Sequence, residues 1–233
     1  MSGAIYDQIA TQLASLYGLT LFAMRGQYLA LRAPGVEQTP HALKRLNEGL
    51  RSSAQTFDQH ASEALAGYFD IVTEDVSDAL REELRASLGV LQANIRRALA
   101  TNIVQIMHMA RAGRLDFAKL LKSAHGAMGA LVQQHMSRIA FTVPDHVDPS
   151  RNWDAERYMR FIVRDWAYQS CIAACLEDIR REGDLVQVSY PDPRRDFVFS
   201  LSGDTAGYVS LQEIRETTFH PNATATVEAY VPA

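Results

Sequence analysis

The stretch LREELRASLGVLQANIRRAL, residues Leu80–Leu99, belongs to the longest regular pattern in the chain. Leucine and isoleucine recur in it every three or four residues, which places them on one face of an α-helix. The pattern runs from Leu65 to Ile106 with a mean spacing of about 3.7 residues, close to the helical period. It therefore predicts a long helix with a narrow apolar stripe. The central stripe consists of Leu80, Leu84, Leu88, Leu91, Ile95 and Leu99.

The length of this helix leaves two interpretations open. An unbroken helix from Pro40 to Ala110 would measure about 100 Å, which is too long for a compact domain of this size. A kink near Gly67 or Gly89 would fold it into a hairpin, with the stripe as the core of an intramolecular bundle. Otherwise the rod protrudes, and its stripe packs against other chains. So narrow a stripe on so long a helix favours the second interpretation, an assembly surface.

Further helices are predicted on both sides of the stripe. The first covers Ile5–Leu31, and Thr39-Pro40 then supplies an N-cap and a first helical residue for the next one. After a glycine break, another helix is expected from Leu115 to about Ala140. Residues 1–142 are thus expected to form a helical region with long amphipathic helices.

The last third of the chain has a different pattern. Residues 143–152 are rich in Pro, Asp and Ser and are expected to link the helices to a C-terminal domain, residues 153–233. A helix should begin near Asp154 and end before Gly183, after which the apolar period becomes two. The predicted strands are LVQVSY, FVFSL and TATVEAYV. The predicted fold class is α+β, mainly α, with a small C-terminal domain of one helix and a short antiparallel or mixed β-sheet.

Composition and charge narrow the functional classes. Hydrophobic residues make up 47% of the 233 residues and charged residues 21%, which are ordinary globular values and argue against general disorder. The net charge of −4 comes from residues 151–233, and no basic block marks a DNA-binding face. The N-terminus has no basic segment before an apolar core, and no apolar run reaches the roughly 20 residues of a spanning helix. We therefore expect a soluble protein made in the cytoplasm.

The residue types that often carry chemistry form no recognisable motif. Cys171 and Cys175 are one helical turn apart, which suits two buried free thiols better than a disulfide. Ser200 and Ser202 lack the Gly-x-Ser-x-Gly context of a nucleophile. No zinc spacing joins the histidines, which are His41, His60, His108, His125, His135, His146 and His220. The tail carboxylates, a weak acid–base candidate in turn-rich sequence, are Asp192, Asp196, Asp204, Glu213 and Glu216. We expect no enzyme activity, no bound metal and no cofactor.

The sequence HPN, residues 220–222, is interpreted as a fixed turn. Pro221 restricts the backbone, and Asn222 can bond its own main chain or adopt a left-handed conformation. His220 can reach from the turn to a neighbouring strand. Such a turn would hold the corner between the Leu211–Glu216 segment and the last strand.

Four segments of the last third, in this order, resemble the C-terminal domain of phage minor capsid proteins, the minor capsid protein 2 and head-morphogenesis group. They are YMRFIVRDWAYQSCIAACLEDIRREG, DLVQVSYPD, VFSLSG followed by YVSLQE, and FHPNATATVEAYVP. The motif residues that the resemblance marks as structural are Arg164, Asp184, Phe199, Ser200, Leu201, Ser202, Gly203, Ser210, Leu211, His220, Pro221 and Asn222.

The resemblance implies a virion protein, present in few copies inside the head or at its vertex and bound to the portal protein or the major capsid protein. It would be needed for head assembly or genome delivery. Self-association and weak contact with packaged DNA are further expected interactions, and no small-molecule substrate is expected. The family's Cys-Arg-His after His-Pro-Asn is Ala223-Thr224-Ala225 here, so that corner has no metal or thiol role. We expect a module that holds its shape and does not turn over a substrate.

Two other functions stay open. An ejected virion protein could use amphipathic helices on DNA or on a bilayer, although residues 1–150 are balanced in charge. A toxin-like enzyme, such as an ADP-ribosyltransferase, is sometimes joined to this domain group. Such an enzyme would need a nucleotide-binding Arg, a Ser-Thr-Ser strand and a Glu-x-Glu loop, and the chain offers only SLQE at residues 210–213.

Overall fold

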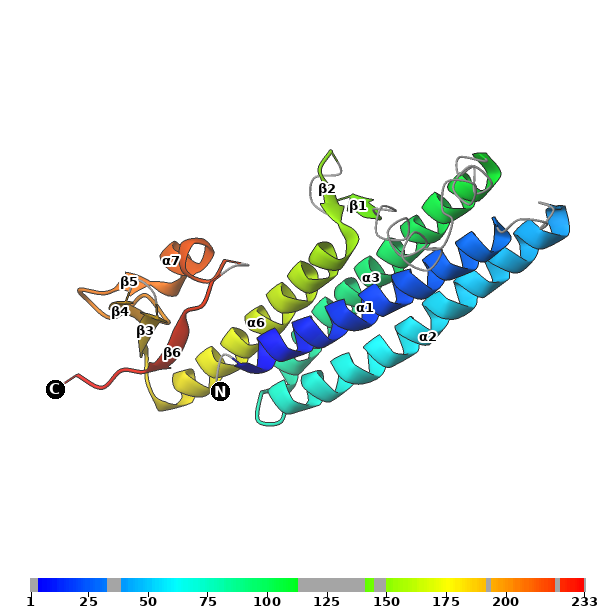
Figure 1. Cartoon of the computed structure of the whole chain (residues 1–233). Helices are drawn as coiled ribbons and strands as arrows, with labels where there is room; N and C mark the ends of the chain where they lie inside the picture. Colours follow the sequence, from blue (N-terminus) through cyan, green and yellow to red (C-terminus); the bar gives the residue numbers. More distant parts are fainter. Residues whose placement is uncertain are drawn as a thin grey trace. The chain divides into compact units, whose positions relative to one another are not determined.

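The computed structural model describes residues 4–32, 39–112, 141–144, 150–191, 194–220 and 223–232. It confirms the predicted fold class, because three long N-terminal helices precede a small region of one long helix and short strands (Figure 1). The helices are α1 (Ala4–Leu31), α2 (Pro40–Val72), α3 (Asp78–Ala112), α6 (Ala155–Glu182) and α7 (Leu211–Thr218). The strands are β1 (Thr142–Pro144), β2 (Asn152–Asp154), β3 (Leu185–Pro191), β4 (Arg194–Ser200), β5 (Val209–Ser210) and β6 (Thr226–Ala229).

The chain forms two compact units. The sheet unit comprises Met1–Gln12, Glu63–Leu91 and Arg160–Ala233, and the helical unit comprises Leu13–Ser62 and Gln92–Met159. The four long helices α1, α2, α3 and α6 each contribute to both units. The predicted linker at residues 143–152 lies inside the helical unit, and the division of the chain at that linker stays a prediction. The predicted helix 115–140 lies outside the described residues.

The helical unit is built around large buried side chains. Tyr17 and Phe57 pack edge to face, with ring centroids 5.3 Å apart, and both are fully buried. The Tyr17 hydroxyl donates to Oδ1 of Asn102, so the buried amide of α3 is satisfied from α1. A Cβ at Gly18 would lie 2.9 Å from Cδ of Glu156, the end of an exposed and flexible side chain that can move aside at little cost.

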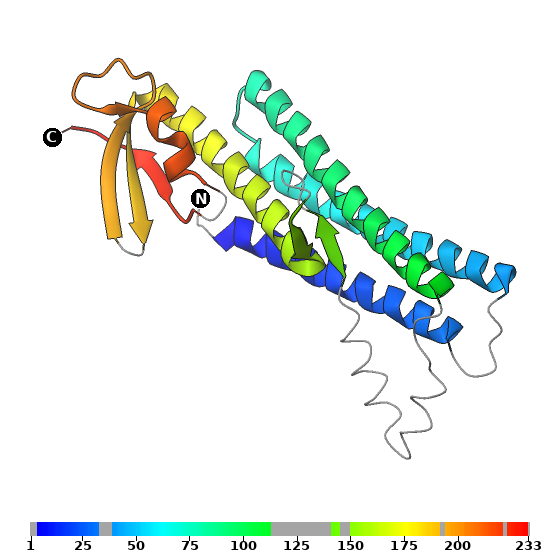
Figure 2. The same ribbon diagram turned by 90° about the horizontal axis from the view of Figure 1, so that it is seen from above.

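A short antiparallel hairpin that the sequence analysis did not predict completes the helical unit. Thr142 pairs with Asp154 and Pro144 with Asn152, so β1 and β2 lie side by side (Figure 2). Val143 is fully buried, and Gln105 of α3 donates to the Thr142 carbonyl at 2.8 Å. The ends of the expected linker are thus ordered by pairing with each other and with α3.

α2 and α3 form a helical hairpin, and the break lies at residues 73–77 and not at Gly67 or Gly89. The Ser77 Oγ accepts from the Leu80 amide at 3.2 Å and caps α3, while Arg81 donates to the Thr73 carbonyl at 2.9 Å. These capping contacts specify the turn, whereas a glycine alone is tolerated within a helix. The predicted kink positions are therefore wrong, although the hairpin itself was one of the two expected arrangements.

The apolar stripe belongs to the chain's own core. Four of its side chains are buried, with exposed fractions of 6% for Leu84, 4% for Leu91, 1% for Ile95 and 3% for Leu99. The other two, Leu80 and Leu88, are half-buried. In the helical unit Arg96 of α3 reaches Asp58 of α2 at 3.0 Å, and in the sheet unit Arg85 lies over the Phe69 ring at 5.6 Å. Folding the two helices together covers the stripe. The interpretation of these residues as an assembly surface is therefore wrong, and the intramolecular alternative holds.

The sheet unit contains a mixed four-stranded sheet in the order β5-β4-β3-β6. β3 pairs antiparallel with both β4 and β6, and β5 pairs parallel with β4. Val186 and Val188 of the central strand and Phe199 of β4 are fully buried. The alternation predicted β3, β4 and β6 correctly, because one face of each strand is apolar.

Helix α7 was not predicted, although its sequence contains a capping signal. The Ser210 side chain accepts from the Glu213 amide at 3.3 Å, as in the Ser-x-x-Glu arrangement that begins many helices. After α7, Phe219 packs edge to face on Phe199 with ring centroids 6.3 Å apart. The polar sequence of α7 hid a helix that is held by its cap and by the aromatic residue that follows it.

Candidate functional site

Arg164, the central arginine of the resemblance, joins three segments within the sheet unit. Its Nε donates to Oδ1 of Asp7 in α1 at 2.8 Å, and its Nη2 donates to the Ala223 carbonyl at 3.2 Å. Its guanidinium also lies 5.3 Å from the centroid of the Tyr6 ring. The side chain is only 16% exposed, so water competes weakly for these contacts. We call Arg164, Asp7 and Tyr6 the arginine clasp.

Buried aromatic and amide groups of α6 extend the contacts of the clasp. Tyr168 packs edge to face on Tyr6 at 5.2 Å and donates from its hydroxyl to the Ala225 carbonyl at 3.1 Å. Burial raises the pKa of Tyr168, so its hydroxyl stays a donor at neutral pH. Gln169 donates to the Phe219 carbonyl. Together with Arg164, these side chains fasten both ends of the 219–225 segment to α6.

Asp184 organises the loop between β4 and β5. Its carboxylate accepts from the Ser200 hydroxyl at 2.5 Å, from the Thr205 hydroxyl at 2.6 Å and from the Ser202 amide at 2.6 Å. The hydrogen bonds from Ser200 and Thr205 hold the pKa of Asp184 well below its usual range. We call Asp184, Ser200, Ser202 and Thr205 the aspartate lock.

The glycine of this loop fits the same network. Gly203 has a φ of 81°, in the left-handed region that L side chains rarely adopt, and its amide donates to the Ser200 Oγ at 2.8 Å. A Cβ at this position would also lie 3.1 Å from Cβ of Ser210. Ser200 is fully buried, and both its donor and its acceptor capacity are used inside the protein. The Ser200 hydroxyl is therefore a structural group and is not presented as a nucleophile.

The remaining motif residues divide between core, cap and turn. Phe199 is fully buried and Leu201 retains 8% exposure, whereas Leu211 is half-buried at the start of α7. The side chain of His220 is exposed, and its carbonyl accepts from the Ala223 amide at 2.8 Å. Pro221 and Asn222 lie outside the described residues, so the corner expected from the HPN sequence stays a prediction.

The tail carboxylates do not form an acid–base pair among the residues that are described. Asp196 on β4, Asp204 in the following loop and Glu213 on α7 are all exposed. Asp192 and the side chain of Glu216 lie outside the described part, as do His125, His135 and His146. His41, His60 and His108 are exposed on α2 and α3. Within the described ranges, no cluster of three His, Cys, Asp or Glu side chains could hold a metal ion.

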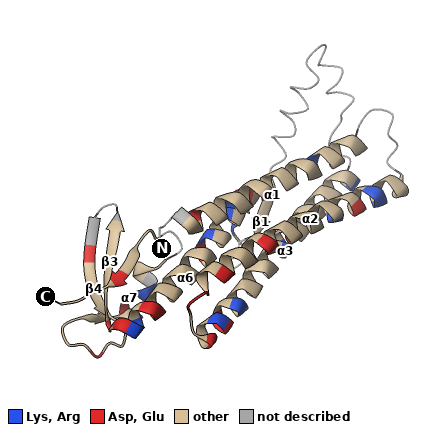
Figure 3. Ribbon diagram, turned by 90° about the horizontal axis from the view of Figure 1, so that it is seen from below, with Lys and Arg blue, Asp and Glu red and all other residues tan. Residues whose placement is uncertain are grey.

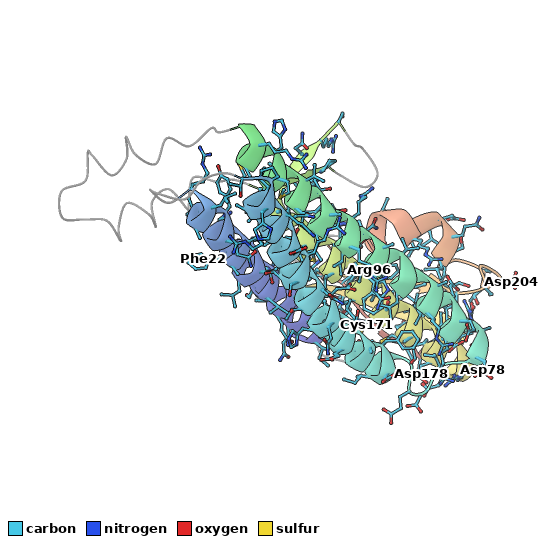
Figure 4. The ribbon with its side chains drawn as sticks, turned by 90° about the vertical axis from the view of Figure 1, so that its right-hand side faces the viewer. Phe22, Asp78, Arg96, Cys171, Asp178 and Asp204 are labelled. Carbon is cyan, nitrogen blue, oxygen red and sulfur yellow. The ribbon has the colours of Figure 1, made fainter. Side chains whose placement is uncertain are left out.

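Cys171, which is labelled in Figure 4, and Cys175 are free thiols, half-buried on α6. A hydrogen bond between the two thiols, together with burial, raises the pKa of Cys171. The same hydrogen bond lowers the pKa of Cys175. Cys175 therefore ionises first, and the pair contains one thiol that is more reactive than the other.

Several residues that position this part of the molecule were not singled out from the sequence. Asp7 and Tyr6 lie more than 150 residues from Arg164, so no local spacing links them to it. Tyr168 and Gln169 looked like ordinary helix-face residues. Thr205 sits in a polar loop, where threonine is common. Their roles depend on contacts between distant segments, which one sequence does not display.

Comparison with known families, with curated proteins and with solved structures finds no match for this chain. None of the described helices has the length and apolarity needed to cross a bilayer. The geometry on its own defines a small α+β unit whose motif residues hold the main chain in place.

Proposed function

We propose that this protein is a structural component of a phage head, a minor capsid protein that acts at the portal or the inner head surface. In this role it supports head assembly or genome delivery and turns over no substrate. Its partners are the portal protein, the major capsid protein or both, and it resides in the virion after synthesis in the host cytoplasm.

One observation carries the proposal. The polar residues that give the resemblance are occupied in fixing the fold: Arg164 in the arginine clasp, Asp184 and Ser200 in the aspartate lock, and Ser210 at the start of α7. Motif residues of an enzyme would instead converge on a cavity with perturbed, accessible groups. A motif made of capping and tying residues supports a rigid module that presents a surface to other proteins.

The charge distribution favours this role over that of an ejected DNA-binding protein. Lys and Arg are interspersed with Asp and Glu along the helices (Figure 3), and exposed pairs such as Lys44–Glu48 and Arg96–Asp58 neutralise one another. Binding to the DNA backbone depends on basic residues gathered on one face. A protein that docks on other proteins has no such requirement.

The test is the phenotype of particles made without this protein. We expect empty or non-infectious heads by electron microscopy, DNA content and plaque titre, and recovery when the wild-type chain is supplied in trans. Mass spectrometry of purified wild-type heads should detect the protein in few copies. Full infectivity without the protein, together with its absence from wild-type heads, would refute the proposal.

A matched pair of variants separates the module from the rest of the chain. Supplied in trans, Ser200→Ala weakens the aspartate lock and should reduce incorporation into heads. Arg160→Ala, an exposed change on α6, should be incorporated normally. Equal incorporation of both variants would mean that the locked loop has no part in docking.

A further inference from the structure

An open groove of about 680 Å³ lies between α2 and α3 within the helical unit. One face of α2 lines it with Pro40, Leu43, Asn47 and Arg51. One face of α3 lines it with Ile103, Val104, Met107 and Arg111. Leu43 and Ile103 are half-buried, and Val104 is 67% exposed. The floor of the groove is therefore apolar and accessible, which is unusual for a surface with no occupant.

The rim of this groove is basic. Lys44, Arg51, His108 and Arg111 line it, and among the residues that the structure describes no carboxylate does. Within the described part of the chain, Arg51 and Arg111 are exposed and make no ion pair, and Lys44 pairs only with exposed Glu48 at 3.8 Å. The groove thus combines apolar surface with the positive charge of Arg51 and Arg111, which pair with no described carboxylate. We call it the basic groove, and it fits a segment that is both apolar and acidic.

The chain itself carries such a segment in the sheet unit. Residues 70–78, DIVTEDVSD, form the end of α2 and the turn into α3 and contain four carboxylates and no basic residue. Asp70, Glu74 and Asp75 are exposed, and Ile71 is 55% exposed. A recess of about 400 Å³ lined by Ile71, Val76 and Asp75 also includes Asp178 of α6. Figure 4 shows Asp78 and Asp178 at this end of the sheet unit. We call residues 70–78 the acidic tip.

The acidic tip is held in shape by the fold. The Ser77 amide donates to Oε2 of Glu177 at 2.8 Å, and the Ser77 hydroxyl donates to the other oxygen of the same carboxylate. Asp78 is paired with Arg81 at 3.1 Å, whereas Glu74 and Asp75 form no ion pair with described residues. A fixed turn that presents Ile71 among unpaired carboxylates loses little entropy when it binds.

We propose that the acidic tip of one copy of this chain docks into the basic groove of a second copy. Ile71 would contact the apolar floor of the groove. Glu74 and Asp75 would pair with Arg51 and Arg111. The two surfaces differ, so the contact is heterologous, and every bound copy keeps one surface for a further copy. Repetition therefore gives an open chain or a closed ring. This inference does not depend on the proposed virion function.

Sedimentation velocity of the full chain over a range of concentrations tests the contact. We expect the associated fraction to rise with protein concentration at low salt. The association constant should fall by about tenfold or more at high salt, because salt screens exposed charge pairs. The groove variant Arg51→Glu/Arg111→Glu and the tip variant Glu74→Lys/Asp75→Lys should each be monomeric. Arg160→Glu, an exposed basic residue on α6, should associate like the wild type.

Mixing the two variants is the decisive measurement. The groove variant places glutamates at positions 51 and 111 against the acidic tip, and the tip variant places lysines at positions 74 and 75 against the basic groove. Each variant repels itself, but the two complement each other, so the mixture should associate again. Circular dichroism of each variant shows whether it is folded, and recovery on mixing also excludes a folding defect.

Three results would overturn the inference: a wild type that is monomeric at every concentration at low salt, association that neither charge reversal weakens, or a mixture that stays monomeric. If the wild type stays monomeric but a synthetic peptide of residues 70–78 binds the groove, the groove serves another acidic partner and self-docking is refuted.

Discussion

The guanidinium of Arg164 in α6 donates from Nε to Oδ1 of Asp7 in α1 at 2.8 Å, and from Nη2 to the main-chain carbonyl of Ala223 at 3.2 Å. One side chain thereby connects the first helix, the long C-terminal helix and the segment that leads into β6. A planar group with five donors in a fixed arrangement suits this task, and a lysine could not make both contacts in the same geometry.

Arg164→Ala should lower the free energy of unfolding by roughly 2 kcal/mol, because it removes charge-assisted hydrogen bonds and leaves the Ala223 carbonyl without this donor. Urea denaturation followed by circular dichroism measures the change. Arg160 on the same helix is exposed, so Arg160→Ala should change the free energy of unfolding by less than about 0.5 kcal/mol. Arg164→Lys should resemble the alanine variant. Equal stability of all three variants would show that the clasp is not a stabilising contact.

Asp184→Asn should destabilise the loop between β4 and β5 by about 1 kcal/mol, because an amide accepts hydrogen bonds more weakly than a carboxylate. In the folded protein the pKa of Asp184 lies below its usual 3.8, so its stabilising contribution is present above pH 3.8. That contribution is lost as the pH falls through the folded-state pKa. The protection factors of the Ser202 and Gly203 amides, which are corrected for the intrinsic pH dependence of exchange, should therefore fall at acid pH in the wild type.

The asparagine variant supplies the control for this pH dependence. It should show low protection factors for the Ser202 and Gly203 amides already at neutral pH, and a smaller fall of these factors on acidification. Identical pH profiles in the two proteins would mean that Asp184 does not hold this loop.

Leu91→Ala should lower the free energy of unfolding by about 3 kcal/mol, since Leu91 retains only 4% exposure and its truncation leaves a cavity. Its neighbour Val90 is 63% exposed, and Val90→Ala should be almost neutral. Thermal denaturation of the two variants makes the comparison. If Leu91→Ala were as stable as Val90→Ala, Leu91 would not be a core residue.

Cys175 should react with iodoacetamide at a lower pH than Cys171, because the hydrogen bond between the thiols lowers the pKa of Cys175 and raises that of Cys171. Labelling rates across a pH series, measured by mass spectrometry, give both pKa values. Cys171→Ala should raise the pKa of Cys175, because the stabilising hydrogen bond is lost. An unchanged labelling profile of Cys175 in that variant would contradict the assignment.

Much of the secondary structure could be predicted because its signals are local. The helix expected at Ile5–Leu31 is observed at Ala4–Leu31, and α2 begins at Pro40, where the Thr39 hydroxyl accepts from the Ala42 amide at 3.1 Å. The helix expected from Asp154 is observed at Ala155–Glu182. Caps, apolar period and strand alternation depend on residues only a few positions apart.

The errors occurred where local signals were weak or conflicting. α7 has too few apolar residues for a clear period, and its Ser210–Glu213 cap is the one local signal that marks its start. The β1–β2 pair was hidden in sequence that has the composition of a linker. The turn between α2 and α3 was placed at glycines, whereas the Ser77 cap and the Arg81 contact with Thr73 determine it. In each case a side chain-to-main chain hydrogen bond outweighed composition.

By itself, the sequence determined that this protein consists of long amphipathic helices followed by a small sheet, because hydrophobic period and capping act over one or two turns. Only the tertiary structure decided what covers the stripe and what the motif residues do. A periodic pattern specifies which face of a helix is apolar, but any apolar surface can bury that face. The contacts of Arg164 with Asp7 and of Asp184 with Ser200 and Thr205 arise only when the fold brings separate segments within hydrogen-bonding distance.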